Sequence, residues 1–301
     1  MRHAFSIRMS LSDPLYNTDL NEAAVNDLVR GEYMESLRLR TKDNATLSLS
    51  EYRGEKWAQM TDEDVSKEGQ DAHEGDRRHR LLREHGHRSL ARPFGYLDDN
   101  GTSHLSVVDN DGNSVAMTSS VNGIFGSWIF SEKTGVLLGN TMDDFGVPGR
   151  SNFFGLKPSE ANFIAPGKKP LSSMSPTMVF RRQEGRYYSE KDEWGSLVLT
   201  LGGSGGPKII TAVLQVLLNV CFLGMPLFES MAKPRLHDQL IYHDSVVTGT
   251  ERDVLKQGPI LEVSQRTKDA LMKRGHSLID MDYTGCVQAV AVDLDTKTLS
   301  A

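Results

Sequence analysis

The chain has 301 residues, of which 38% are hydrophobic and 25% charged, and its formal net charge at pH 7 is −6. This length permits one large domain or two smaller ones with a hydrophobic core of modest size. The acidic balance argues against a general binder of nucleic acid or of membrane surfaces. Cys221 and Cys286 form no disulfide framework and have no metal-ligand spacing, so we expect two buried thiols in preference to one disulfide.

Helical patterns dominate the first 57 residues. A short amphipathic helix is expected within residues 1–13, ended by the turn-forming run DPLY, and residues 21–40 have the clearest helical periodicity. Residues 58–97 mix charges of both signs with few apolar side chains, which predicts a mobile linker. The linker holds histidines whose spacing fits no common metal site, namely His73, His79, His85 and His87.

Strands are expected from residue 102 onward. Residues 103–121 alternate apolar and polar side chains around the dipeptide Asp111-Gly112, which predicts a β-hairpin. Further strands are predicted by the runs 134–140, 176–183, 195–203, 276–282 and 286–295. Helices are predicted at 209–220 and near 263–275, and the apolar stretch 209–225 is shorter than the roughly 20 residues that span a bilayer. Because strands and helices come in blocks, the pattern favours an α+β fold of sheets packed between helix layers.

A glycine-rich loop, GGSGGPK at 202–208, joins a predicted strand to a predicted helix. The spacing of its glycines fits neither a P-loop nor a dinucleotide-binding motif, which argues against a nucleotide-binding site. Two interpretations stay open: a tight strand-to-helix turn, or a loop that aims backbone N–H groups at a negatively charged oxygen.

Two other segments carry polar groups that suit charged ligands. PLSSMSPT at 170–177 places serine hydroxyls between prolines, and GNTMDDF at 139–145 carries the adjacent carboxylates Asp143 and Asp144. A carboxylate can bind a ligand ammonium group, whereas a metal site needs more converging oxygen ligands than the segment offers. An ordinary polar loop and a helix cap are the structural alternatives.

The junction between the predicted linker and the first strand is Gly101-Thr102. An internal threonine is a poor nucleophile, because its hydroxyl needs a nearby base. Cleavage of the Gly101–Thr102 bond would give Thr102 a free α-amine, whose ordinary pKa of about 7.7–8.0 suits that role. A threonine at the edge of a strand after a turn is the structural alternative.

Several motifs occur in one order along the chain: GTSHLSVVDNDGNSVAMTSSVN, GNTMDDF, KKPLSSMSPTMV, GGSGGPKIITAVLQVLLN and PRLHDQL. Together they closely resemble the gamma-glutamyltranspeptidase (glutathione hydrolase) family, over essentially all of residues 98–301. The resemblance implies the N-terminal nucleophile hydrolase fold, a four-layer αββα sandwich. It also implies a division into the end of the large subunit (1–57), a linker ending at the self-cleavage site (58–101) and a C-terminally incomplete small subunit (102–301).

The family's activity implies roles for named residues. Thr102 would be freed by self-cleavage and would attack the γ-glutamyl amide of glutathione and its conjugates, with Ser120 supporting it. The backbone N–H groups of Gly205 and Gly206 would form the oxyanion hole. The substrate's amino and carboxylate groups would be held by Asn122, Thr141, Asp144, Ser172 and Ser173. The acyl group would then pass to water or to an acceptor amino acid or dipeptide, with no cofactor, metal or nucleic acid involved and the two cleaved parts forming a heterodimer.

The sequence departs from the family's pattern at several points. Ser120 stands where a second threonine is usual, which keeps the hydroxyl, and Thr141 stands where Glu or Gln is usual, which removes one contact to the amino group. The linker is longer than usual, and no residue matches the family's carboxylate-binding arginine. We therefore expect a chain that holds part of the large subunit and most of the small subunit.

Two alternatives to this function remain open, a related N-terminal nucleophile acylase and a catalytically silent homologue. Ser172, Ser173 and Asp144 favour an amino-acid substrate over a simple acyl group. Family analogy predicts a place at the plasma membrane or outside the cell, with which the glycosylation sequons at Asn44 and Asn100 are compatible.

Overall fold

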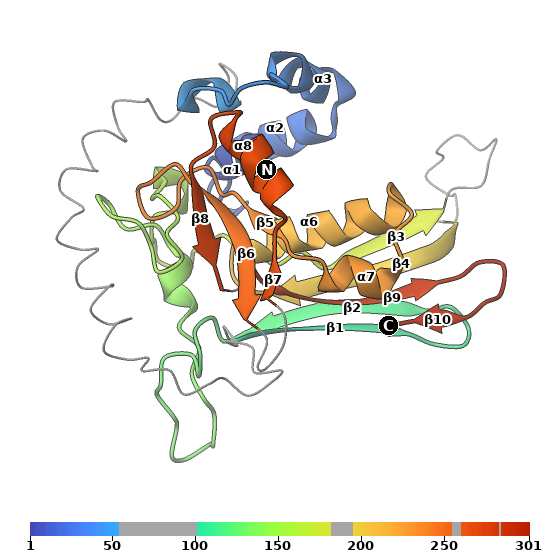
Figure 1. Ribbon diagram of the computed structural model, residues 1–301. Coiled ribbons are helices and arrows are strands. Elements are labelled where there is room, and N and C mark those ends of the chain that lie inside the picture. Colours follow the sequence, from blue (N-terminus) through green and yellow to red (C-terminus); the bar gives the residue numbers. More distant parts are fainter. Residues whose placement is uncertain (54–100, 182–194, 255–259, 283) are drawn as a thin grey trace. The chain divides into compact units, whose positions relative to one another are not determined.

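The computed structural model describes residues 1–53, 101–181, 195–254, 260–282 and 284–301. The predicted linker therefore lies outside the described residues apart from Gly101, as do its four histidines and Asn100. The chain divides into two compact units (Figure 1). Unit 1 comprises residues 1–97, 141–172 and 236–283, and unit 2 comprises 98–140, 173–235 and 284–301.

Unit 2 begins with the predicted hairpin, which is confirmed. Strands β1 (Thr102–Val108) and β2 (Ser114–Ser120) pair antiparallel, with Thr102 opposite Ser120. The turn between them is fixed by Asp109, whose carboxylate accepts from the backbone N–H groups of Asp111 and Asn113 at 3.0 and 2.8 Å. Since the turn fixes the register, every second residue from Thr102 faces the same side of the hairpin.

The second sheet of unit 2 has the strand order β10-β9-β4-β3. Its strands are β3 (Thr177–Arg181), β4 (Ser196–Ser204), β9 (Cys286–Val292) and β10 (Leu299–Ser300). Helix α6 (Lys208–Cys221), as predicted, packs on one face with α7 (Leu227–Ala232), where they bury a core of Leu199, Leu201, Ile209, Ala212, Val213, Val216, Leu227, Val287 and Ala289. The β1–β2 hairpin covers the other face, against β4 and β9 (Figure 1). Unit 2 is thus a helix layer on two stacked sheets, which confirms the predicted α+β class.

Unit 1 combines N-terminal helices with a second sheet. The helices are α1 (Arg2–Arg8), α2 (Thr18–Val29), α3 (Gly31–Arg40) and α8 (Gln265–Met272), with the short 3-10 helix η1 at Leu49–Arg53. The sheet contains β5 (Leu236–His237), β6 (Thr248–Val254), β7 (Ile260–Glu262) and β8 (Leu278–Met281), and β8 runs parallel to β6. The helical pattern of residues 21–40 is divided in two because Arg30 has extended backbone angles.

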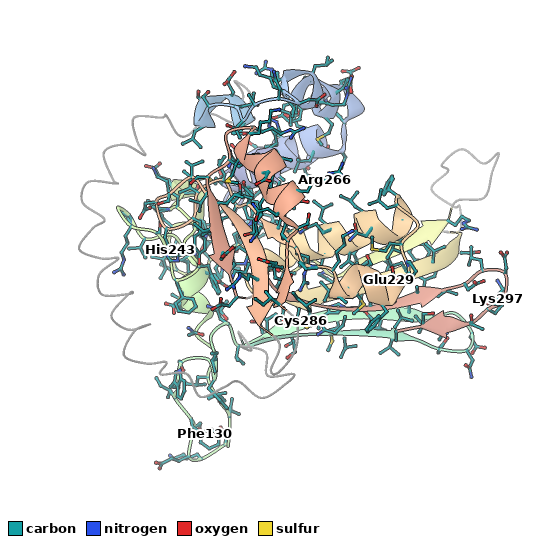
Figure 2. All side chains as sticks on the ribbon, viewed as in Figure 1. Phe130, Glu229, His243, Arg266, Cys286 and Lys297 are labelled. Atoms are coloured by element: carbon teal, nitrogen blue, oxygen red, sulfur yellow. The ribbon has the colours of Figure 1, made fainter. Side chains whose placement is uncertain are left out.

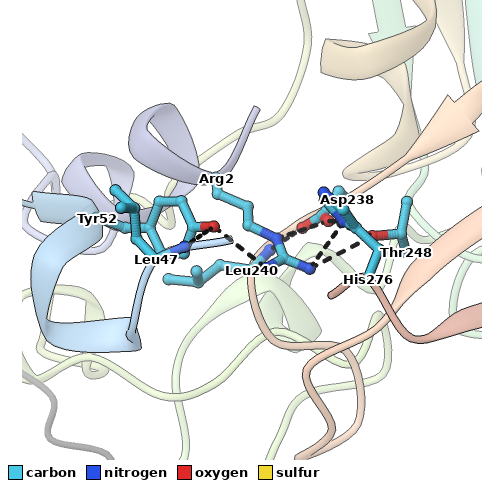
Figure 3. Close-up of polar contacts among 7 residues, drawn as sticks. All are labelled: Arg2, Leu47, Tyr52, Asp238, Leu240, Thr248 and His276. Atoms are coloured by element: carbon cyan, nitrogen blue, oxygen red, sulfur yellow. Dashed lines mark hydrogen bonds and ion pairs between the residues drawn. The ribbon is translucent and has the colours of Figure 1, made fainter. Parts of the chain in front are cut away.

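A buried ionic cluster joins the first helix of unit 1 to its sheet (Figure 3). Arg2 donates from Nε to Asp238 at 2.8 Å, and Thr248 donates to the same carboxylate at 2.6 Å. The Arg2 guanidinium also contacts Tyr52 and His276, each at 3.3 Å. Burial and the Arg2 charge lower the pKa of His276, so the imidazole is neutral at pH 7 and does not repel the guanidinium.

Two expectations from the sequence are wrong, and three short strands were missed. Residues 134–140 form no strand; they lie in an irregular loop with one bridge between Phe130 and Leu137 (Figure 2). Cys221 is exposed and Cys286 is half-buried, so the thiols are not both interior. The short strands β5, β6 and β7 were not expected, because they are brief or rich in polar residues. Within the described residues, no helix combines the length and apolar character needed to cross a bilayer.

Candidate active site

The hairpin of unit 2 brings the hydroxyls of Thr102 and Ser120 together. Because these residues are directly opposite each other in the register, their side chains lie on the same face, and Oγ1 and Oγ are 2.7 Å apart. Thr102 is only 7% exposed. Ser120 Oγ also accepts from the backbone N–H of Asn122 at 2.9 Å and lies 3.4 Å from the carbonyl oxygen of Gly101. One hydroxyl thus links the predicted nucleophile to the bond before it.

The Gly101 carbonyl is held by the segment that follows β2. Its oxygen accepts from the backbone N–H of Val121 at 2.9 Å. Gly101 has φ +69°, and a Cβ there would lie 2.1 Å from the carbonyl oxygen of Gly123. Only glycine fits this position, since both the backbone angle and the close approach exclude a side chain. The bond that the sequence predicts to be cleaved therefore has a hydrogen-bonded carbonyl and a hydroxyl on its C-terminal residue.

A neutral histidine shares the inner face of the hairpin with these hydroxyls. His104 is 8% exposed and contacts Thr118 Oγ1 at 2.7 Å and Ser106 Oγ at 3.0 Å. Its ring lies so close to Gly202 that a Cβ there would be 2.3 Å away. Burial lowers the pKa of His104, so this layer between the sheets is polar but uncharged.

Asn122 follows the hairpin in a left-handed backbone conformation, with φ +73°, and is 5% exposed. Its side-chain NH₂ group donates to the backbone carbonyl of Asn140 at 3.1 Å. This bond directs the amide oxygen Oδ1 away from Asn140 as an acceptor. An acceptor at this position suits an ammonium group, as the sequence predicts.

Gly205 and Gly206 form the turn between β4 and α6, with φ of +130° and +61°. At the start of the helix, the Gly205 carbonyl accepts from the Lys208 N–H at 3.3 Å and the Gly206 carbonyl accepts from the Ile209 N–H at 3.1 Å. Among the described residues, no acceptor is found for the N–H group of either glycine. Two such donors at the start of a helix are suited to a negatively charged oxygen.

The predicted ligand residues of unit 1 lie on another turn. Thr141 and Asp144 are the ends of a short 3-10 helix, η3 (Thr141–Asp144), which is anchored by the buried Phe145. Thr141 is exposed and Asp144 half-buried. Burial raises the pKa of Asp144 to about 6; the Arg8 charge opposes the shift and Asp143 adds to it. Asp144 is thus mostly ionised at pH 7 but incompletely neutralised by the protein, a state that favours a cationic ligand.

Ser172 and Ser173 belong to an irregular segment before β3, as predicted. Ser172 is exposed and Ser173 half-buried, and the boundary between the two units falls between them. Within unit 1, Asn162 joins this segment to the Asp144 turn: its side chain donates to the Asp144 carbonyl at 2.8 Å and accepts from the Leu171 N–H at 3.0 Å.

The structure therefore brings the predicted residues together in two sets. Unit 2 holds the Thr102–Ser120 pair, Asn122, Ser173 and the glycine turn, and unit 1 holds Thr141, Asp144 and Ser172. Sequence reasoning missed Asn140 and Asn162, which tie the ligand-bearing turns, and Arg8, whose charge acts on Asp144. Asparagine beside a turn was the available signal, since its amide bonds readily to backbone groups.

Comparisons with a family model, with curated proteins and with solved structures all point to one family. The family model for gamma-glutamyltranspeptidase matches residues 1–301. Glutathione hydrolase 3 of Arabidopsis thaliana is 34% identical over 96% of this chain and 37% of its own length. Putative inactive glutathione hydrolase 4 of the same plant is 33% identical over 77% of this chain and 96% of its own length. The gamma-glutamyltranspeptidase of Pseudomonas nitroreducens, solved with L-DON, superposes with a TM-score of 0.53 at 36% identity, covering 65% of this chain and 91% of that one. The chain spans about a third of the length of the first of these relatives.

Proposed function

The chain belongs to the gamma-glutamyltranspeptidase family and has the N-terminal nucleophile hydrolase fold. On that premise we propose that it is a γ-glutamyl hydrolase and transpeptidase, with Thr102 as nucleophile after cleavage of its own Gly101–Thr102 bond. The observation that carries this proposal is the contact of 2.7 Å between Thr102 Oγ1 and Ser120 Oγ, beside a Gly101 carbonyl that is hydrogen-bonded to Val121.

Self-cleavage would begin with attack of Thr102 Oγ1 on the Gly101 carbonyl carbon. Ser120 takes up the hydroxyl proton as it gives up its own, and negative charge on the carbonyl oxygen is stabilised by the Val121 N–H. The C–N bond then breaks, the Thr102 nitrogen takes up the proton that Ser120 released, and the Gly101 acyl group is carried as an ester on Oγ1. Water hydrolyses the ester, which leaves a carboxylate on Gly101 and both a free amine and a free hydroxyl on Thr102.

Turnover would use the new amine as general base for the same hydroxyl. Thr102 Oγ1 attacks the γ-carbonyl of the substrate, and the N–H groups of Gly205 and Gly206 stabilise the oxyanion; such a donor typically contributes about 10²–10³ in rate. The leaving amine departs with a proton, and a γ-glutamyl ester forms on Thr102. Water or an acceptor amino acid or dipeptide then releases the glutamyl group.

Recognition of the glutamyl group would rest on charge. Asn122, Thr141 and Asp144 would hold the α-amino group, and Ser172 and Ser173 the α-carboxylate. Because Thr141 is neutral, Asp144 supplies the negative charge of this set. The raised pKa of Asp144 supports this role, since a carboxylate that its surroundings neutralise poorly gains most from a bound ammonium. Glutathione and its conjugates fit this chemistry, and the two parts would remain together as a heterodimer at the cell surface or outside the cell.

The proposal is tested by expressing the gene product as wild type and as Thr102→Ala. We expect the wild type to give two bands on a denaturing gel and to release anilide from a γ-glutamyl anilide, and the variant to do neither. Equal activity of both proteins would eliminate Thr102 as nucleophile.

A silent homologue is the second candidate, favoured by the resemblance to a relative described as putatively inactive. Mass spectrometry after treatment with a glutamine-analogue inhibitor separates the two functions. An adduct on Thr102 supports the enzyme, whereas a wild type with neither adduct nor turnover supports the silent protein. Turnover of simple acyl amides in preference to γ-glutamyl amides would instead indicate an acylase.

A further inference from the structure

We propose that Asn140 is a positioning residue which holds the Val121–Gly123 segment in place, both for self-cleavage and for recognition of the substrate's amino group. This inference rests on the proposed function and deepens it. It assigns a role to a residue outside the set that the sequence predicts for the site.

Asn140 forms hydrogen bonds with three consecutive residues of the segment. The Asn140 N–H donates to the Val121 carbonyl at 3.1 Å, and its carbonyl accepts from the Asn122 side chain at 3.1 Å. Its side-chain oxygen Oδ1 accepts from the Gly123 N–H at 2.7 Å. A Cβ on Gly123 would lie 3.1 Å from the Asn140 side chain, so the two residues are in close contact.

Asn122 is the left-handed residue of the segment, with φ +73°. Asparagine adopts this conformation more readily than other non-glycine residues, and the Asn140 bonds to Val121 and Gly123 hold the segment in it. Of these three Asn140 bonds, the one to Gly123 uses the Asn140 side chain, so a substitution that removes the acceptor breaks it while leaving the two backbone bonds available. The side chain is therefore the part of this clamp that mutation can test.

The first consequence concerns the bond before Thr102. The same segment supplies the Val121 N–H to the Gly101 carbonyl, and the Asn122 N–H to Ser120 Oγ. It also places the Gly123 carbonyl against Gly101. Loss of the Asn140 bond would let the segment move and misalign the donors that stabilise negative charge during self-cleavage.

The second consequence concerns the substrate. Because the Asn122 NH₂ group donates to Asn140, the amide oxygen is the end of the side chain that remains to accept from an ammonium. Among the described residues no donor to this oxygen is found. Displacement of the segment would therefore weaken binding of the α-amino group more than binding of the acyl chain.

The experiment compares Asn140→Leu and Asn140→Asp in the gene product. Leucine has a similar size but cannot accept a hydrogen bond, whereas aspartate keeps the acceptor for Gly123. The rate of self-cleavage is measured on denaturing gels. For the cleaved protein, kcat and KM are measured with γ-glutamyl-4-nitroanilide and with glutaryl-4-nitroanilide, which lacks the amino group. Asn113→Leu is the matched control, because Asn113 also ties a turn of unit 2 through its side chain, by bonding to Asp109 at 2.8 Å.

We expect Asn140→Leu to slow self-cleavage and to raise KM for the γ-glutamyl substrate, each about tenfold, with little change for the glutaryl substrate. The self-cleavage rate and the KM of Asn140→Asp should be closer to the wild-type values than those of Asn140→Leu. Asn113→Leu should leave the preference between the two substrates unchanged. The inference is overturned if Asn140→Leu behaves as wild type, if it impairs both substrates equally, or if aspartate is as impaired as leucine. Should the leucine variant not fold, Asn140→Ser is judged by the same criteria. A wild type that neither cleaves itself nor turns over either substrate contradicts the proposed function instead.

Discussion

The buried polar groups of the two units differ in charge. In unit 2 the hydroxyls of Thr102 and Ser120 share a face with His104, which burial keeps neutral. In unit 1 the charges of Arg2 and Asp238 are paired at 2.8 Å, with side-chain exposures of 8% and 5%. A neutral hydroxyl pair can relay a proton when the receiving hydroxyl gives up its own, whereas breaking a buried ion pair leaves an uncompensated charge. We infer that unit 2 carries the groups that react, whereas the ion pair of unit 1 holds the protein together.

Cohesion matters because the proposed cleavage divides the chain before Thr102. Arg2 precedes that point, and Asp238, Thr248 and His276 follow it, so the ionic cluster links the two products (Figure 3). Unit 1 is itself composed of residues from both products. We therefore expect the products to stay associated through unit 1 after the bond is cut in unit 2.

The largest effect is expected where this cluster is broken. Arg2→Met leaves the Asp238 carboxylate buried without its cation, and loss of one partner of a buried pair typically costs about 3–5 kcal/mol. The free energy of unfolding should fall by that amount in urea denaturation, and the cleaved parts should separate more readily on size exclusion. The self-cleavage rate at a temperature where the variant is folded should be unchanged.

A matched control for this variant is Arg38→Met. Arg38 is also an arginine of an N-terminal helix in an ion pair, at 2.6 Å from Glu35, but both side chains are more than half exposed, at 69% and 51%. Such a change should alter stability by less than about 0.5 kcal/mol. If the two variants lost equal stability, the cluster would not be the link between the products.

The next largest effect is expected for the Thr102–Ser120 hydroxyl pair of unit 2. Ser120→Ala removes the hydroxyl that contacts Thr102 and accepts from the Asn122 N–H. Since positioned proton-transfer groups typically contribute 10²–10⁴ in rate, we expect self-cleavage to slow by about 100-fold or more. Ser120→Thr should cleave nearly as wild type, and Ser119→Ala, on the exposed face of the same strand, should have no effect. Rapid cleavage by Ser120→Ala would show that Thr102 does not use this hydroxyl.

A smaller effect is expected at the residue before the nucleophile. Gly101→Ala would place Cβ 2.1 Å from the Gly123 carbonyl, so the scissile bond must shift, and we expect cleavage to slow about tenfold or more. Gly112→Ala is the matched control: Gly112 also has a positive φ, +84°, but a Cβ there meets nothing within 4 Å. Both variants carry backbone strain of about 1 kcal/mol, and only one disturbs the bond. Equal cleavage rates would contradict the role of the close approach.

The Thr102–Ser120 hydroxyl pair can be predicted from the sequence more directly than the rest of the site. A tight turn at Asp111-Gly112 between alternating arms fixes the register, and the register alone places Ser120 opposite Thr102. The Asn122–Asn140 contact does not follow, because it depends on the left-handed angle of Asn122 and on the path of the loop from 123 to 139. That loop was expected to contain a strand at 134–140, but within the part of the chain that the structure describes its only pairing is the single bridge between Phe130 and Leu137.

The charged groups of unit 1 were the least predictable. Arg2, Asp238 and His276 are far apart in the sequence, and only the tertiary fold brings them together. The pattern Met-Asp-Asp marks Asp144 as a candidate ligand residue, but the direction of its pKa shift depends on burial and on Arg8, which lies more than a hundred residues earlier. Burial of a specific charge is a property of packing, and local sequence does not encode it.

The smallest effect concerns the one carboxylate of unit 1 that is assigned to ligand binding. The pKa of Asp144 is raised to about 6, so the fraction ionised falls from about nine-tenths at pH 7 to about half at pH 6. Because an ammonium ligand requires the ionised form, KM for the γ-glutamyl anilide should rise roughly twofold over that interval, and further below it. The same raised pKa means that ionising Asp144 lowers the stability of the folded protein as pH rises from about 4 to 6.

Two variants test whether Asp144 is the group that causes the pH dependence of KM. Asp144→Asn should remove the pH dependence of KM between 5 and 7 and raise KM throughout. Asp143→Asn should move the dependence to lower pH, because the Asp143 charge is one cause of the raised pKa, and removing it favours ionisation of Asp144. In the proposed mechanism the Thr102 amine would titrate in a higher pH range and act on kcat, so the two groups would be distinguishable. A KM profile that is the same in wild type and in Asp144→Asn would mean that the charge in unit 1 serves cohesion alone, and the division of roles between the units would be complete without a ligand-binding carboxylate.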